Sequence, residues 1–455
     1  MKSQNTDLRN GQFSRRQFAG AGIGLGAFLL PQSTHRAQAS PVDSPCKAVV
    51  VLLLEGGMSH FESWDPKPEA PAEIRGEFDA IATANPDLNV GEHFTRLARL
   101  ANEYNVVRSV FAPNKRNDHS PGLHWVLTGY DNQAAGVSLV KANTHASMGA
   151  VAAHQRGDRS PAGLMNFVAV PDRKQLGGRV NFNHALHLGS ANEAFDTGAI
   201  PDQATGKYAV PTGLVLPQSV ELSRFKDRRA LLDALNRTQR VVDTQATDSI
   251  GGFQAYACDL LLGSRGQTAF DLNLESAATR RRYGDHYFGQ RILMARRLIE
   301  AGVTYVVVNL SKNNSWDAHK NNFVSHRQKL PQLDEAVSAL LTDLIDRGLL
   351  DETLVLMTGE MGRTPRINGN AGRDHWSRAW SVMMAGGGLT RGQVLGSTTT
   401  DGSDPASRPV HLNEVLATVY HQLGIDPDMT VSDELGRPIR IQPESSPVEE
   451  LLASS

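Results

Sequence analysis

Cysteine is nearly absent from the 455-residue chain, which contains only Cys46 and Cys258. Two thiols are too few for a cysteine-based zinc site or a disulfide-rich scaffold, and the sequence leaves open whether they pair. An excess of charge of one sign is also absent, because 46 Lys and Arg residues face 48 Asp and Glu residues. Nothing in this composition indicates a nucleic-acid partner.

After residue 40 the chain also lacks any long apolar segment. The apolar run at residues 19–30 is too short to cross about 30 Å of hydrocarbon. It follows Ser-Arg-Arg-Gln-Phe at residues 14–18 and precedes Ala-Gln-Ala at residues 37–39, the pattern of a twin-arginine export signal. We therefore expect residues 1–39 to be a signal peptide read by the twin-arginine translocase. The mature protein would be periplasmic or secreted, without a stable membrane anchor.

Residues 40–455 contain several short, continuous apolar runs that are typical of strands buried on both faces. They are Lys47–Leu54, Val303–Leu310, Thr353–Met357 and Trp380–Ala385. Amphipathic helices are expected between them, at Arg281–Ala301, Phe323–Arg347 and His411–Leu423. This alternation predicts one α/β domain, a doubly wound, mostly parallel sheet with helices on both faces. The less regular stretch Phe167–Leu274, with a charged helix at Arg224–Val242, is expected to be an insertion or cap.

Polar side chains follow the predicted strands, at the edge where open parallel sheets bind ligands. Three strand ends carry carboxylates and imidazoles, accompanied by arginines: these residues are Glu55, Asp317, His319, Glu360, Arg363, Arg366, Arg373, Asp374 and His375. Such ligands suit a divalent cation such as Zn²⁺ or Mn²⁺. Asp317 and His319 are two residues apart, so in an extended segment both would point to the same side.

Each of these residues also has an ordinary structural interpretation. A single Asp-His or Asp-x-His pair is common on surfaces and in helix caps. It is the convergence of several such groups on predicted strand ends that favours a metal site. Other histidines have no comparable context and are expected to be surface or internally satisfied residues, namely His93, His145, His154, His184, His187 and His286.

The ordered motifs of the mature chain resemble those of the DUF1501 family. They include LLEGGMSHFESWDPKP, HSPGLHWVLTGY, WDAHKNNF, TGEMGRTPRINGNAGRDHW and VHLNEVLATVYHQLGI, and they cover nearly the whole mature chain. The family in turn resembles the alkaline phosphatase and sulfatase superfamily in fold. The resemblance therefore implies an alkaline-phosphatase-like α/β domain with a metal-dependent site.

That resemblance assigns expected roles to individual residues. It implies metal ligands at Glu55, at Asp317 with His319 or Asn321, and at His375, and it places Glu360 as a further ligand or a base. Met361 stands where superfamily members have a second-site histidine, so a single ion is expected rather than a pair.

The stretch SPGLHWVLTGY resembles the sulfatase segment in which a nucleophile begins a helix. By this resemblance His119 occupies the position of the nucleophile, with Ser120 one residue away as the second candidate or as a helix cap. A histidine could ligate the metal, transfer a proton or accept a phosphoryl group, but it cannot become formylglycine. Unpaired N–H groups at the helix start after Pro121, with Arg363, Arg366 or Arg373, would suit a phosphate or sulfate ester.

Two classes of function remain open from the sequence. One is an exported metal-dependent hydrolase of phosphate or sulfate esters, acting on an anionic small molecule or glycan. The other is a non-catalytic protein with the same fold that binds an anionic glycan or a partner protein. Bound metal together with turnover of aryl esters would favour the first class.

The export signal predicts the outcome of a conservative substitution. Replacing Arg15 and Arg16 by lysine should leave the precursor in the cytoplasm, because the twin-arginine receptor reads the paired guanidinium groups. Fractionation of cells followed by immunoblotting measures this outcome. Normal export of the Lys-Lys variant would contradict the assignment.

Overall fold

The computed structural model describes residues 44–453, apart from residues 45, 114–116, 132–143, 158, 162, 212, 213, 313 and 434 and most of 215–263. The expected signal peptide, Cys258 and most of the expected helix at 224–242 therefore lie outside the described residues. Cys46 is buried, and its thiol donates to the carbonyl oxygen of Ala48. Within the described ranges, no helix combines the length and apolar character needed to cross a membrane.

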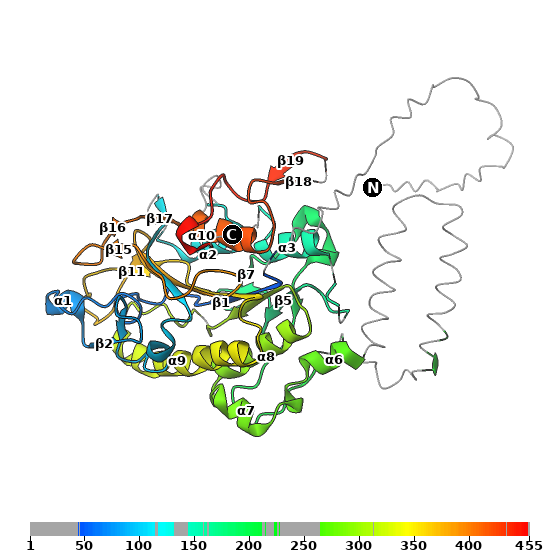
Figure 1. Ribbon diagram of the computed structural model, residues 1–455, viewed down its shortest axis with the longest axis horizontal. Helices are drawn as coiled ribbons and strands as arrows, with labels where there is room; N and C mark the ends of the chain where they lie inside the picture. The colour runs from blue at the N-terminus through cyan, green and yellow to red at the C-terminus, as the bar shows by residue number, and fades with distance from the viewer. Residues whose placement is uncertain are drawn as a thin grey trace, which may run out of the picture. The chain divides into compact units, whose positions relative to one another are not determined.

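A central sheet forms the framework of the protein (Figure 1). Its strands are, in spatial order, β14 (Val394–Leu395), β4 (Asn105–Phe111), β13 (Trp380–Ala385), β10 (Thr353–Thr358), β1 (Ala48–Leu53), β9 (Tyr305–Asn309), β5 (Phe167–Val170) and β8 (Phe195–Asp196), with β17 (Val410–His411) paired to β4. The strands from β10 to β8 are parallel, and β13 is antiparallel to both β10 and β4. β4 therefore runs in the same direction as β10.

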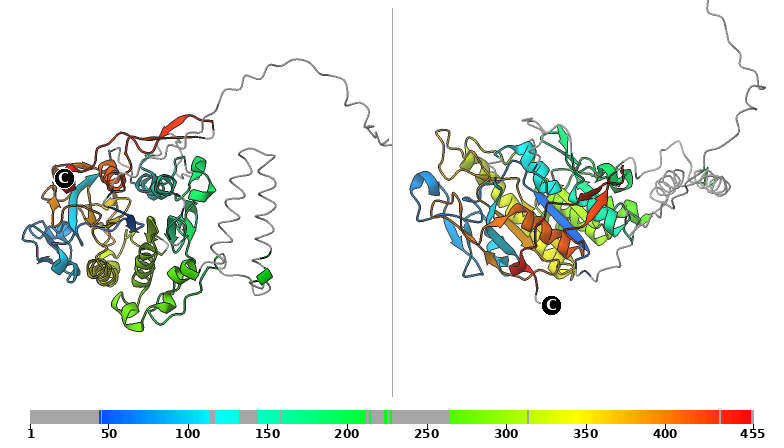
Figure 2. Two further views of the ribbon diagram at one scale, coloured as in Figure 1. Left: turned by 45° about the vertical axis from the view of Figure 1, so that its right-hand side comes forward. Right: turned by 90° about the horizontal axis from the view of Figure 1, so that it is seen from above.

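Helices cover both faces of this sheet, as Figures 1 and 2 show. α2 (His119–Thr128), α3 (Met148–Arg156) and α10 (Leu412–Gln422) pack on one face, and α8 (Tyr287–Glu300) and α9 (Asn322–Asp346) pack on the other. β1 divides its side chains between the two cores. Val50 and Leu52 belong to the core under α8 and α9, whereas Val49, Val51 and Leu53 belong to the core under α2, α3 and α10. This alternation explains why β1 is a continuous apolar run.

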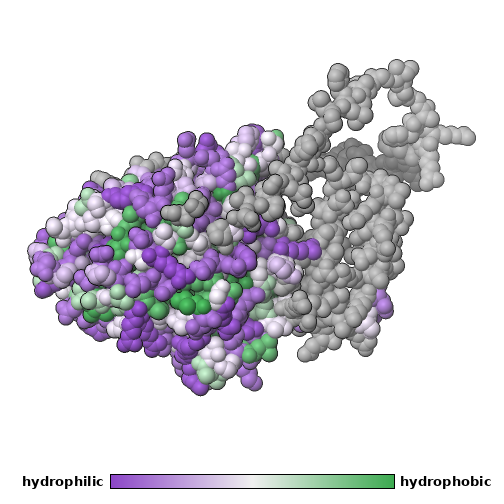
Figure 3. Space-filling model, in the orientation of Figure 1, coloured by the Kyte–Doolittle hydropathy of each residue, from purple (hydrophilic) through white to green (hydrophobic). Residues whose placement is uncertain are grey.

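Smaller elements surround the sheet. They are α1 (Ala72–Arg75), β2 (Ala80–Ala82), β3 (Asn89–Gly91), β6 (Lys174–Gln175), β7 (Val180–Asn181), α6 (Ser264–Phe270), α7 (Ala277–Arg282), β11 (Gly362–Arg363), β12 (His375–Trp376), β15 (Ser397–Thr398), β16 (Pro405–Ser407), β18 (Thr430–Ser432) and β19 (Pro438–Arg440). On the face drawn in Figure 3, hydrophilic residues surround small groups of apolar ones.

The expected fold class, a mostly parallel α/β sheet with helices on both faces, is confirmed. The expected helix at 281–301 is wrong in one respect, because it is two helices. The chain breaks after α7 at Gly284, whose φ of 106° lies in the left-handed region and cannot continue a right-handed helix. α8 then begins beyond His286, whose Nδ1 accepts a hydrogen bond from the amide of Gly289.

Two strands of the central sheet lie inside the stretch that was expected to be an insertion or cap. β5 and β8 lie inside residues 167–274, yet both are strands of the central sheet, and β5 pairs directly with β9. The sequence prediction missed β5 because it is only four residues long and is followed by turn-rich sequence. Among its described residues, the stretch also carries the β6–β7 hairpin and the short α6.

The register of the sheet brings three strand ends to one edge. Leu53 of β1 pairs with Thr358 of β10 and with Asn309 of β9, so the residues that follow these strands emerge side by side. Beyond β1 the chain turns sharply at Gly57, whose φ is 74°. A Cβ atom at Gly57 would lie 2.7 Å from the carbonyl oxygen of Met361, so this turn admits only glycine without movement of the β10 loop.

This close approach predicts unequal effects of two similar substitutions. Gly57→Ala and Gly348→Ala both place a side chain at positive φ, but a Cβ atom at Gly348 meets nothing within 4 Å. Both should lose about 1 kcal/mol of unfolding free energy to backbone strain, and Gly57→Ala should lose roughly 1–3 kcal/mol more to the clash. Chemical denaturation measures the difference. Equal losses would show that the β10 loop moves aside freely.

Candidate metal centre

Four side chains meet at this edge of the sheet and are called the His–Asp cluster below: His119, Asp317, His319 and His375. His119 is the first residue of α2, Asp317 and His319 follow β9, and His375 belongs to β12, ahead of β13. Because β13 runs against β10, its beginning lies at the edge where β10 ends. All four side chains therefore reach the same place from separate parts of the chain.

The ligand atoms of the His–Asp cluster face one another. The Nε2 atoms of His319 and His375 are 3.0 Å apart, and each is 3.1 Å from Oδ1 of Asp317. Nε2 of His119 is 3.1 Å from the other carboxylate oxygen, Oδ2. That nitrogen is buried and has no hydrogen-bond partner in good geometry.

The opposite nitrogen of each imidazole is held by an oxygen acceptor. Nδ1 of His375 contacts the carbonyl oxygen of Asn117 at 2.9 Å. The Nδ1 atoms of His319 and His119 contact carboxylates, at 2.7 Å from Asp374 and 2.6 Å from Glu360 respectively. An oxygen acceptor requires the proton to sit on Nδ1, so each neutral ring presents the lone pair of Nε2 to the cluster.

Several electron-rich atoms that face one another at about 3 Å repel unless a cation lies among them. Adjacent ligands of an ion bound at 2.0–2.2 Å lie roughly 3–3.5 Å apart, which matches the spacing found here. Within the described part of the chain, His119, Asp317 and His375 are the one group of at least three His, Cys, Asp or Glu ligand atoms lying within 4.8 Å of one another. The imidazole nitrogens and the carboxylate oxygen fit Zn²⁺ or Mn²⁺.

The electrostatics of the metal-free cluster also favour bound positive charge. Burial alone would lower the pKa of His119, but its contacts with Asp317 and Glu360 outweigh burial and raise this pKa to about 9. Burial would raise the pKa of Asp317, but His119, His375 and Arg363 outweigh it and hold that pKa well below its ordinary value. The carboxylates therefore attract either a proton or a metal ion to this site.

Arg363 holds the carboxylate of Asp317 in place. Its guanidinium group donates to Oδ1 of Asp317 at 2.7 Å and to the carbonyl oxygens of Gly56 and Gly57. The side chain is fully buried. Arg363 therefore links the turn after β1 to the metal-facing carboxylate.

A pair of buried carboxyl groups lies behind His119. Glu360 accepts from His119 and from the amide of Gly56, while the oxygens of Glu55 accept from the amide of Leu176 and the side chain of Asn309. Burial and the neighbouring charge of Glu360 raise the pKa of Glu55 to about 7. Gly122 allows the close approach of α2, because a Cβ atom there would lie 3.1–3.3 Å from atoms of Glu360.

The structure separates the predicted ligands into two groups. It brings together Asp317, His319 and His375, and it adds His119 to them. Glu55 and Asp374 do not join the cluster, because each carboxylate is engaged elsewhere: Glu55 with Leu176 and Asn309, and Asp374 with the far side of the His319 ring. Glu360 also lies behind an imidazole, and its fully buried side chain orients His119.

The predicted anion-binding arginines differ in exposure. Arg363 and Arg373 are fully buried and bonded to protein acceptors, so the expectation that they contact substrate is corrected. Arg366 alone of the three is exposed. Of the two alternatives for Ser120, a second-choice nucleophile or a helix cap, the structure excludes the cap, because α2 begins at His119 with Asp118 as its N-cap and Ser120 is buried inside the helix.

Sequence reasoning missed two groups of the site. The carbonyl oxygen of Asn117 fixes His375, and the amide of Leu176, in the β6–β7 hairpin, donates to Glu55. Both are main-chain atoms, which every residue type has, so the sequence does not indicate their role. Only the rule that a ligating histidine anchors its second nitrogen could have prompted a search for such acceptors.

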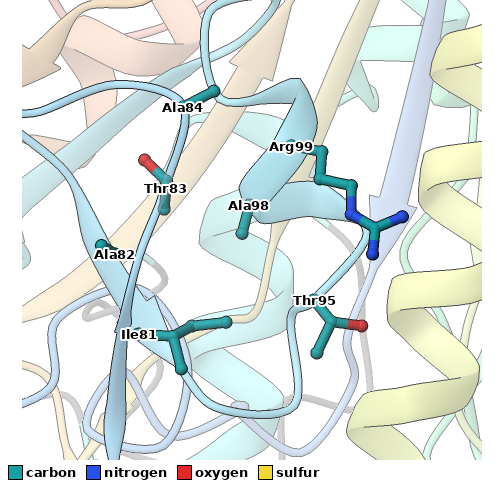
Figure 4. Close-up of a pocket in the computed structure, with 7 residues that line it drawn as sticks. All are labelled: Ile81, Ala82, Thr83, Ala84, Thr95, Ala98 and Arg99. Carbon is teal, nitrogen blue, oxygen red and sulfur yellow. The ribbon is translucent and has the colours of Figure 1, made fainter.

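The His–Asp cluster is reachable from solvent on one side. The exposed fraction of the side chain is 44% for His319 but only 12% for His119. A surface pocket of about 410 Å³, shown in Figure 4, is lined by residues such as Ile81, Thr83, Thr95 and Arg99. Its lining contains no carboxylate or imidazole, so it does not share the chemistry of the cluster.

The protein is thus an α/β protein with a mostly parallel sheet and a His–Asp cluster at the carboxyl ends of its strands. More particularly, the chain belongs to the DUF1501 family, described as proteins of unknown function, which it matches over residues 46–452. No curated protein matches the sequence significantly.

Solved structures with a similar fold include an alkaline phosphatase, a periplasmic domain and a sulfatase. A variant of the alkaline phosphatase PafA has a TM-score of 0.43 at 10% identity, covering 91% of this chain and 100% of that one. The C-terminal periplasmic domain of EcEptC from Escherichia coli, in complex with Zn, has a TM-score of 0.40 at 9% identity, covering 89% and 95%. The PsFucS1 sulfatase from Pseudoalteromonas sp. has a TM-score of 0.36 at 12% identity, covering 83% and 68%. These similarities assign no role to any residue of this chain.

The cluster predicts a loss of metal on single substitutions. Asp317→Ala, His319→Ala and His375→Ala should each lower the content of divalent metal and the melting temperature, because an ion that binds only the native state stabilises it. Elemental analysis and thermal unfolding measure both effects. His154→Ala, at an exposed position of α3, is the control and should retain the metal. Unchanged stoichiometry in all three variants would eliminate the site.

Proposed function

We propose that the protein is an exported hydrolase of phosphate or sulfate esters that uses a single divalent ion held by the His–Asp cluster. One observation carries this proposal: the Nδ1 atoms of three imidazoles each lie against an oxygen acceptor, so that all three Nε2 atoms face one carboxylate. A hydrogen-bonded surface cluster has no need of such an arrangement. A metal centre does, because it requires deprotonated ligand atoms and fixed ring orientations.

Each residue around the cluster would have a separate role in such a centre. When bound, a divalent ion supplies Lewis acidity toward an ester oxygen and lowers the pKa of water, so a hydroxyl side chain is not needed as nucleophile. Asp317 offsets the charge, and buried Arg363 holds its carboxylate in place. Glu360 keeps the proton of His119 on Nδ1 and so keeps Nε2 directed at the cluster.

The exposed side of the cluster supports an anionic substrate. His319 is the most exposed of its four side chains, and the loop between β11 and β12 carries exposed Arg366. A guanidinium group on this loop would attract a phosphate or sulfate ester and suits its oxygens geometrically. We propose that the anionic small molecule or glycan ester binds there, after the protein has left the cytoplasm through the twin-arginine translocase.

Removal of the metal should abolish activity. Treatment with a chelator is expected to eliminate hydrolysis of aryl phosphates or aryl sulfates, and addition of Zn²⁺ or Mn²⁺ to the dialysed protein should restore it, because the ion activates both water and ester. Initial rates across a panel of esters measure this. Protein that retains its metal but hydrolyses no ester would favour a binding protein for an anionic glycan or partner instead.

Two substitutions at the start of α2 distinguish water from serine as the nucleophile. His119→Ala should greatly reduce turnover and weaken metal binding, whereas Ser120→Ala should lose at most about tenfold, equivalent to one hydrogen bond of about 1.4 kcal/mol. Ser120 is buried within α2, which supports this order. Rates and metal content should be measured together for both variants. Full activity in His119→Ala would refute the proposed role of this residue.

A further inference from the structure

The loop between β11 and β12 carries Arg373 and Asp374, which contact the residues that hold the His–Asp cluster. A buried ion pair between Arg373 and Glu62 anchors this loop. Arg373 is fully buried, and its Nε and Nη2 atoms donate to Oε1 of Glu62 at 2.9 and 2.8 Å. The exposed fraction of Glu62 is 1%. Burial would raise the pKa of Glu62, but Arg373 outweighs it and lowers this pKa below its ordinary value, so the pair is ionised.

Arg373 also gathers the main chain around it. Its guanidinium group donates to the carbonyl oxygens of Thr364, Pro365 and Ile74. The ring of Phe61 lies 4.3 Å from the guanidinium carbon. One side chain therefore ties both ends of the β11–β12 loop to the segments that contain Glu62 and Ile74.

The backbone of Arg373 lies directly between ligand-bearing segments. Its amide donates to the carbonyl oxygen of Ala318, which separates Asp317 from His319, and its own carbonyl oxygen accepts from Arg363. The next two residues are Asp374, which fixes the ring of His319, and His375. A displacement of Arg373 would therefore move the cluster from two sides at once.

We propose that Glu62 and Arg373 form a positioning pair, which sets the separation and ring orientation of His319 and His375. This inference rests on the proposed metal centre. Within the described residues, Glu62 makes no hydrogen bond or ion pair with any of the four cluster residues. It therefore acts through Arg373. Its effect would resemble that of outer partners of metal ligands, whose loss weakens metal binding about 10–100-fold.

Glu62→Gln tests the pair, because it keeps the size of the side chain and removes the charge that holds Arg373. The matched control is Glu275→Gln, which breaks the ion pair of another buried arginine, since Glu275 lies 3.0 Å from Nη2 of Arg296 and the exposed fractions of the two side chains are 12% and 2%. That pair joins the segment before α7 to α8, on the opposite face of the sheet from α2. Both variants should melt at lower temperature than the wild type.

Binding of Co²⁺ to the full mature chain separates positioning from general stability. Glu62→Gln should bind Co²⁺ about 10–100-fold more weakly and shift its visible absorption bands, whereas Glu275→Gln should keep both the affinity and the spectrum of the wild type. Unchanged affinity and bands in Glu62→Gln would overturn the positioning role, as would an equal weakening in the control. Wild-type protein that binds Co²⁺ but hydrolyses no ester would refute the proposed activity alone.

A second measurement needs no metal. In metal-free protein labelled with ¹⁵N-histidine, the ring-nitrogen signals of His319 and His375 should shift in Glu62→Gln and stay in place in Glu275→Gln. If Glu62→Gln does not fold, Arg373→Lys replaces it, because lysine can meet Glu62 but cannot reach the carbonyl oxygens of Thr364, Pro365 and Ile74 together. Ring signals identical to those of the wild type in the folded variant would overturn the inference, whatever the outcome with Co²⁺.

Discussion

The carboxylate of Asp317 is the constraint on which the rest of the site depends. Three imidazoles approach its two oxygens from different parts of the chain, and a fully buried guanidinium group holds one oxygen from behind. Burial would raise the pKa of this carboxyl group, but His119, His375 and Arg363 hold it well below its ordinary value, so the group is charged. The start of α2 supplies His119, the segment after β9 supplies His319, and the strands β11 and β12 supply Arg363 and His375.

The groups behind the imidazoles matter as much as the imidazoles themselves. Each Nδ1–H donates a hydrogen bond to an oxygen acceptor. The acceptor is a carbonyl oxygen for His375, an exposed carboxylate for His319 and a buried carboxylate for His119. Three acceptors of different strength therefore hold the three rings around one point. The buried Glu360 would make His119 the most electron-donating of them, since its contact is the shortest and the least solvated.

The sequence predicted the parts of this structure that depend on periodicity. Apolar runs located β1, β9, β10 and β13, and the rule for strand ends located Asp317, His319 and His375. Direction was not predictable, because the apolar run of β13 reads the same whether it pairs parallel or antiparallel. The break at Gly284 was missed because a single glycine can also be tolerated inside a helix.

Burial and ring orientation account for the remaining differences. Arg363 and Arg373 were predicted to bind an anionic ester, but both are buried, and tertiary contacts with carbonyl oxygens and carboxylates make that burial possible. Asp374 precedes a cluster histidine, yet it supports the ring of a different one, His319. No pattern in one sequence specifies which histidine, or which of its ring nitrogens, a carboxylate will contact. The acceptor for His375 is a main-chain oxygen of Asn117 and leaves no trace in residue type.

The order of the cluster residues along the chain has a consequence for how the protein would acquire its ion. His119 is made early, Asp317 and His319 follow after nearly two hundred residues, and His375 comes late in the chain. A growing polypeptide on the ribosome therefore cannot assemble the full coordination sphere until most of its synthesis is complete. Under the proposed twin-arginine route, which carries folded proteins, the ion would be chosen from the cytoplasmic metal pool. The supply of metal inside the cell, rather than in the compartment where the protein works, would then decide which element it carries.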